Sequence, residues 1–160
     1  MTVFTGAIPT VSAGDTTTVS TNLATYRDAL KGVSEAWTTY THGWTGTLGN
    51  GVLVAKYMRV NKFVRFRIQL TWGTTTSHGA SSQAFALPTA AHSDYAANMH
   101  MGNGLALDLS TVAFNNITVG WLTSTSIFML GTANTSVSNT VPWTWATGDK
   151  LSLSGTYETA

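Results

Sequence analysis

The chain has 160 residues, which suits a single domain with a sizeable hydrophobic core. Only 9% of the residues are charged and the formal net charge is +1, which argues against nucleic-acid binding because that needs many cations. The absence of cysteine excludes disulfides, cysteine zinc sites and thiol catalysis, and no apolar run approaches the roughly 18 residues that span a bilayer.

The N-terminal stretch "MTVFTGAIPTVSAGD" has neither the cationic start nor the apolar segment of a secretion signal. Residues 1–19 are rich in Thr, contain Pro9 and show no helical period, so we expect an extended arm. A protein of this kind is expected to stay in the cytoplasm where it is made, or to leave by another route such as lysis.

Residues 20–41 contain the one convincing helical pattern, with Asn22 as its N-cap. Apolar residues recur in alternating steps of three and four, which predicts a heptad seam over about two and a half heptads. This anchoring helix could pack on its own sheet, or its seam could hold several copies around an axis. The seam comprises Leu23, Tyr26, Leu30, Val33, Trp37 and Tyr40.

From Trp44 onward the apolar pattern changes to period two, interrupted by Gly, Asn and Ser. Many short strands with turn signals between them predict an antiparallel, jelly-roll-like β-sandwich over residues 42–160. The fold class is therefore mainly β, preceded by the arm and one short α-helix. The expected strands are Gly49 to Val60, Phe63 to Trp72, Ser82 to Leu87, Leu105 to Leu109, Val112 to Phe114, Ile117 to Leu122, Ser126 to Leu130, Val137 to Trp145 and Lys150 to Glu158.

The stretch "KYMRVNKFVRFRIQ", residues 56–69, holds five of the eight basic residues and no acid. A two-residue turn at Asn61-Lys62 would pair the flanking strands, and directly opposed residues share a face. The predicted core face comprises Leu53, Ala55, Tyr57, Phe66, Ile68 and Leu70, and the solvated face carries Lys56, Arg65 and Arg67.

In this register Lys56 faces Arg67 with like charge, which is unfavourable unless an anion lies nearby. Three anions are open: a carboxylate on an adjacent strand, an acidic partner subunit, or an anionic glycan such as a cell-wall polymer.

The ionisable residues do not form a recognisable reaction centre. Among the acids, only Asp94 and Asp108 lie where a β-domain pocket could gather them, and adjacent His, Ser and Asp in "AHSDY" do not make a triad. The histidines lack metal-ligand spacing, and no phosphate-binding glycine motif occurs. We therefore expect no enzyme activity, no metal site and no cofactor.

Tryptophans at core parity, such as Trp72, are expected to be buried. An aromatic ring at a loop edge beside Asn, His or Thr could instead stack on a sugar. Trp44 and Trp121 are the candidates for such a glycan or partner contact.

Four segments resemble virion structural proteins of tailed phages that infect actinobacteria, many of which are labelled minor tail proteins. These are "DALKGVSEAWTTYTHGWTG" (28–46), "GNGVLVAKYMRVNKFVRFRIQLTWG" (49–73), "FALP" (85–88) and "WTWATGDKLSLSGTYE" (143–158). One departure is His42, where the pattern has proline. The motifs carry no catalytic residue.

The resemblance implies a non-enzymatic subunit that assembles in the host cytoplasm and is released by lysis within the virion. The heptad helix would favour a homotrimer anchored by residues 1–41, and the partners would be other virion proteins of the tail or the major capsid protein. Three roles are open: a tail or tail-tip component that contacts the host surface, a decoration protein on the capsid exterior, or a glycan-binding module.

Overall fold

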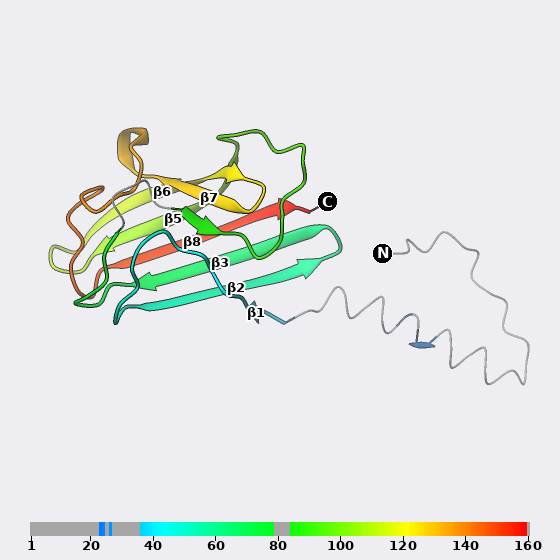
Figure 1. Ribbon diagram of the computed structural model, residues 1–160, viewed down its shortest axis with the longest axis horizontal. Coiled ribbons are helices and arrows are strands. Elements are labelled where there is room, and N and C mark those ends of the chain that lie inside the picture. The colour runs from blue at the N-terminus through cyan, green and yellow to red at the C-terminus, as the bar shows by residue number, and fades with distance from the viewer. Residues whose placement is uncertain (1–22, 25, 27–35, 79–83, 160) are drawn as a thin grey trace, which may run out of the picture.

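The computed structural model describes residues 23–24, 26, 36–78 and 84–159 (Figure 1). Its strands form one antiparallel eight-stranded sheet in the order β1-β2-β3-β8-β5-β6-β7-β4. The mainly-β prediction is confirmed. The elements are β1 (Thr38–Thr39), β2 (Val52–Val60), β3 (Phe63–Thr71), β4 (Ala84–Ala86), β5 (His100–Asp108), β6 (Ala113–Thr123), β7 (Ser126–Leu130), the 3-10 turn η1 (Thr132–Asn134) and β8 (Lys150–Glu158).

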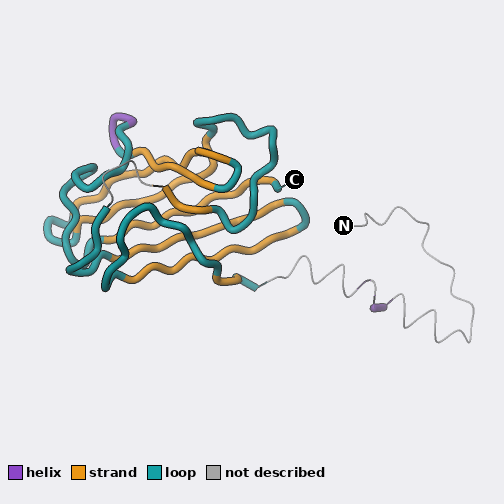
Figure 2. The backbone as a smooth tube through the Cα atoms, in the orientation of Figure 1, coloured by secondary structure: helices purple, strands orange, loops and turns teal. Residues whose placement is uncertain are grey.

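The sheet curls, and the chain between β1 and β2 connects its two edges (Figure 2). The Tyr40 amide donates to the Ala55 carbonyl in β2 at 3.1 Å. A few residues later, the Ala86 amide in β4 donates to the Gly43 carbonyl at 2.8 Å. Because one segment pairs with both edges, the sheet encloses its core without a second sheet, and the predicted two-sheet sandwich is not confirmed.

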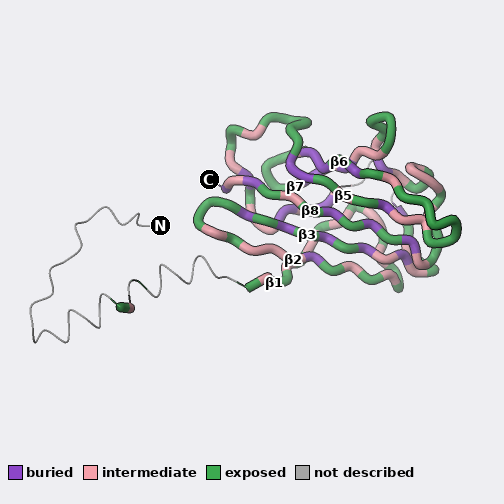
Figure 3. The backbone as a smooth tube through the Cα atoms, turned by 180° about the vertical axis from the view of Figure 1, so that it is seen from behind, coloured by how far each residue is buried: buried purple, intermediate pink, exposed green. Residues whose placement is uncertain are grey.

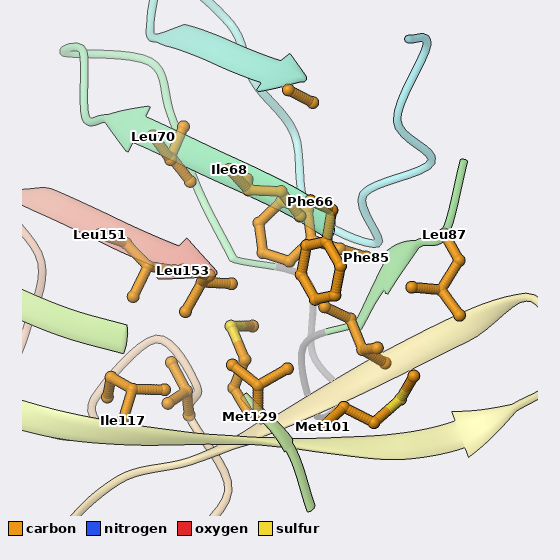
Figure 4. Packing of buried hydrophobic residues seen from close by; sticks show 14 of the residues in the cluster. Phe66, Ile68, Leu70, Phe85, Leu87, Met101, Ile117, Met129, Leu151 and Leu153 are labelled. Atoms are coloured by element: carbon orange, nitrogen blue, oxygen red, sulfur yellow. The ribbon is translucent and has the colours of Figure 1, made fainter. Parts of the chain in front are cut away.

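The core lies on the concave face of this curled sheet (Figure 4). Alternate residues point inward most regularly along β3 and β8, so buried and exposed positions alternate along these strands (Figure 3). Large side chains from both halves of the sheet meet there. They include Phe66, Ile68, Leu70, Phe85, Ile117, Ile127, Met129, Leu151, Leu153 and Tyr157.

The β2–β3 hairpin has the predicted register, with Tyr57 opposite Phe66 and Lys56 opposite Arg67. Asn61 adopts a left-handed φ of 59° at the turn, which Asn tolerates better than most residues. A one-residue slip would turn Phe66 and its core neighbours toward solvent, so burial fixes the pairing.

Other strand predictions differ in accuracy. The bounds predicted for β7 and β8 are confirmed, whereas the two short strands expected on either side of Asn115 form the single strand β6. The predicted strand Val137 to Trp145 is wrong, because the one bridge within this segment joins Ser138 to Val141 and no ladder forms. Pro142 has no amide hydrogen for a ladder, which accounts for the interruption.

The C-terminal end of the predicted anchoring helix 20–41 is corrected by the structure. Thr38 and Thr39 form β1, paired with Tyr57 and Lys56 in β2. The β-branched Thr pair suits an edge strand, which pairs with β2 on one side.

Residues Leu23, Ala24 and Tyr26 have helical backbone. The seam residues Leu30 and Val33 and the arm 1–19 lie outside the described residues. No helix among the described residues is long and apolar enough to cross a membrane.

Candidate functional site

The convex face of the sheet carries the predicted basic side chains. Arg65 and Arg67 are exposed on β3, and Lys56 is half-buried on β2. β8 lies beside β3, and β5 lies beside β8 (Figure 3). The predicted partition of the hairpin into a core face and a basic face is therefore confirmed.

A shallow groove of about 380 Å³ runs over β8 on this face. One row across the groove comprises Arg67, Ser154 and Asn103, which are register partners on β3, β8 and β5. The next row comprises Gln69, Ser152 and Leu105. The floor is low because β8 presents only serines between the longer side chains on either side.

Trp37 lies beside this groove. Its ring stands 4.6 Å from the guanidinium carbon of Arg67, in a cation–π contact. Trp37 was expected on a helical seam, but it comes directly before β1, and the pairing of β1 with β2 places it close to the basic face. Two adjacent β-branched residues, Thr38 and Thr39, were the sequence signal that could have indicated a strand here.

The groove offers hydrogen-bond donors that the rest of the described chain does not use. Within the described ranges, no hydrogen bond is found for the side chains of Gln69, Ser152 and Ser154, which all line the groove. Asn103 Oδ1 is paired with His100 Nε2 at 3.1 Å, which leaves the Asn103 amide hydrogens for another acceptor.

The like-charged Lys56 and Arg67 have no carboxylate beside them in the part of the chain that the structure describes. Within those ranges, one carboxylate lies within ion-pair distance of a basic side chain: Asp94 Oδ2 is 3.3 Å from His92 Nδ1. The carboxylate expected on an adjacent strand is therefore not found among these residues, and the positive potential of the face is directed outward.

The two tryptophans predicted to contact a glycan or partner, Trp44 and Trp121, pack against the core instead of projecting from loop edges. The ring of Trp44 stacks on Phe85 with the centroids 6.0 Å apart and the planes at 9°. Since Phe85 is fully buried, this face of the indole is unavailable to a sugar.

A second hollow, of about 250 Å³, is lined by aromatic side chains that include Trp72, His78 and Trp145. Trp72 and Trp145 stack on each other at 4.0 Å, and His78 lies 4.9 Å from Trp72. The stacked faces of Trp72 and Trp145 cover each other, and Trp145 Nε1 donates a hydrogen bond to the Ser138 carbonyl at 2.9 Å. This cluster serves mainly to close one end of the core.

The two acids considered for catalysis lie at opposite ends of β8. Asp94 lines a small hollow with Glu158, whereas Asp108 immediately precedes Leu109, whose amide binds Asp149. The intervening nine-residue strand spans about 27 Å, far beyond the spacing of a glycosidase pair. Among the described residues, no three His, Asp or Glu side chains are grouped to hold a metal ion.

No family model, curated protein or solved structure matches this chain.

Proposed function

We propose that this chain is a non-enzymatic structural protein of a phage virion, a minor tail or tail-tip component that exposes its β-domain toward the host surface. The proposal starts from the sequence resemblance and is supported by one structural observation. The most specific motif segments, although far apart in the chain, occupy adjacent strands.

The first motif contains β1, the second contains the β2–β3 hairpin, and the last contains β8. In the sheet these elements are consecutive, in the order β1-β2-β3-β8 (Figure 1). These segments thus build half of the fold, including its best-buried strand pair, as expected for a structural module. Segments that built a reaction centre would instead bring ionisable side chains together.

The proposal also covers how copies of the chain are anchored to the particle. Residues 1–19 would form an extended arm and the following residues a short helix, together anchoring three copies to the particle. The two halves of the curled sheet would face each other across the core like the layers of a sandwich.

Labelling of intact particles tests the location. Antibody against the β-domain, visualised with gold on unfixed particles, should mark the tail ends. Label on the heads would replace the tail assignment with the alternative, a capsid decoration protein. Particles free of label, when the same antibody detects the denatured protein in them by immunoblot, would show that the β-domain is not exposed.

The trimer is tested by light scattering on the full chain and on a chain that begins at Ala36. This start retains Trp37 and β1, so the sheet keeps its edge strand. The full chain should have three times the monomer mass and the shortened chain the monomer mass. Equal monomer masses for both would rule out the trimer.

A further inference from the structure

We propose that the groove over β8 binds an extended polysaccharide strand carrying carboxylate groups. This inference deepens the proposed function and rests on it for biological meaning, because a host-facing domain would meet such a polymer at the cell surface. The binding itself can be measured on the isolated protein.

Charge is the first argument. Lys56, Arg65 and Arg67 face outward with no carboxylate partner in the described chain, which favours an anionic ligand. Three cations on a chain of net charge +1 are too few for nucleic-acid binding, which depends on neutralising several phosphates.

The orientation of Arg67 is the second argument. The ring of Trp37 covers the guanidinium group at 4.6 Å, so the group loses less conformational freedom when it binds a ligand. A contact with the flat face of the guanidinium leaves the N–H groups at its edge free, and their planar geometry matches a carboxylate.

The neighbouring donors are the third argument. The floor and the walls present the hydroxyls of Ser152 and Ser154 and the amides of Gln69 and Asn103. Such neutral groups can hydrogen-bond to the hydroxyls of a sugar as well as to an anion. A surface that binds an acidic protein would instead be expected to have aromatic side chains at its centre. The ligand class that uses both kinds of group is an anionic sugar.

The dimensions agree with this ligand. The two rows lie two residues apart along β8, about 7 Å, and each row crosses three strands, about 10 Å. This footprint accommodates one or two sugar rings, and the groove is open so that a polymer can enter and leave it.

The test is calorimetric titration of the full-length protein with oligogalacturonate of about ten sugar units. We expect binding, and we expect the fully methyl-esterified oligomer, which has the same rings but no charge, to bind about tenfold more weakly. An oligoglutamate of equal charge separates recognition of a glycan from attraction to any polyanion. Binding of oligoglutamate as tight as that of oligogalacturonate would overturn the proposal, as would no binding of oligogalacturonate.

Two pairs of variants locate the site. Ser154→Leu fills the groove and should abolish binding, whereas Thr156→Leu makes the same change on the same face of β8 outside the groove lining. Arg67→Ala should weaken binding about tenfold, and Lys62→Ala removes an equal charge at the hairpin turn with little effect. Wild-type affinity in both Ser154→Leu and Arg67→Ala would overturn the groove assignment.

The proposed function and the groove can fail separately. Particles without gold label alongside oligogalacturonate binding in solution would reject the virion surface role and keep the groove. Gold label on the tails, together with no binding of oligogalacturonate in solution, would keep the virion surface role and reject the groove.

Discussion

The guanidinium carbon of Arg67 lies 4.6 Å from the centre of the Trp37 ring, which ties the segment before β1 to the third strand of the sheet. β1 itself has only two residues, and its pairing with β2 leaves it at the edge. A short edge strand gains little from its own ladder, so the contact of Trp37 with Arg67 is expected to help hold it in place.

A double-mutant cycle measures this contact. Trp37→Leu and Arg67→Met remove the ring and the charge in turn, and urea denaturation gives the unfolding free energy of each variant and of the pair. We expect a coupling energy of about 0.5–1 kcal/mol, because Arg67 is exposed. A control cycle combines Trp37→Leu with Lys62→Met in place of Arg67→Met. The coupling energy between Trp37 and Lys62 should be near zero. Equal coupling in both cycles would show that no specific contact exists.

Removal of the buried carboxylate of Asp149 should destabilise the fold. Asp149 is 1% exposed, and its two oxygens accept the amide hydrogens of Leu109 at 3.0 Å and Ala146 at 2.8 Å. Asp149→Ala leaves both amides without this acceptor, which costs about 1–3 kcal/mol. Thermal and urea unfolding measure the loss, and Asp94→Ala is the control because the Asp94 side chain is 87% exposed. Equal stability of the two variants would contradict this role.

Gly102 should be irreplaceable even by alanine. A Cβ there would overlap the Ser154 carbonyl and lie 2.6 Å from the Gly155 Cα, both in the backbone of the central strand β8. Because backbone in a central strand cannot move aside, Gly102→Ala should cost about 3 kcal/mol. Gly131→Ala is the matched control, since its Cβ would meet nothing closer than 3.4 Å. Chemical denaturation gives the unfolding free energy of both variants. A similarly small loss of unfolding free energy in the two would contradict the expected crowding at Gly102.

The sequence predicted the hairpin and the closing strand because their apolar and polar residues alternate without interruption. Tyr57 opposite Phe66 and the bounds of β8 follow from parity alone. Val112, by contrast, was expected to begin a strand, but it adopts a left-handed φ of 56° in the β5–β6 turn. β-branched residues rarely adopt this conformation, so no local preference indicated the turn.

The groove could be predicted only in part. The basic side of β3 follows from the hairpin register, but Ser152, Ser154 and Asn103 reach it through long-range pairing of β3, β8 and β5. Trp37 was assigned to a helix because its spacing from Val33 and Tyr40 fits a heptad. The observed pairing of β1 with β2 outweighs that spacing, as tertiary contacts often outweigh local propensity.

The turn after β5 provides a pH-dependent prediction. Hydrogen bonds from the side chains and amides of Ser110 and Thr111 lower the pKa of Asp108 from its ordinary value of 3.8. A carboxyl whose pKa is lower in the folded state stabilises the fold above its unfolded pKa, and this contribution is lost as the pH falls through the folded pKa. Asp108→Asn should therefore lower the melting temperature at about pH 6, and the difference from the wild type should shrink as the pH approaches about 3. Melting curves across this range, with Asp94→Asn as the control, measure the difference. A constant difference at every pH would show that the charge of Asp108 does not contribute.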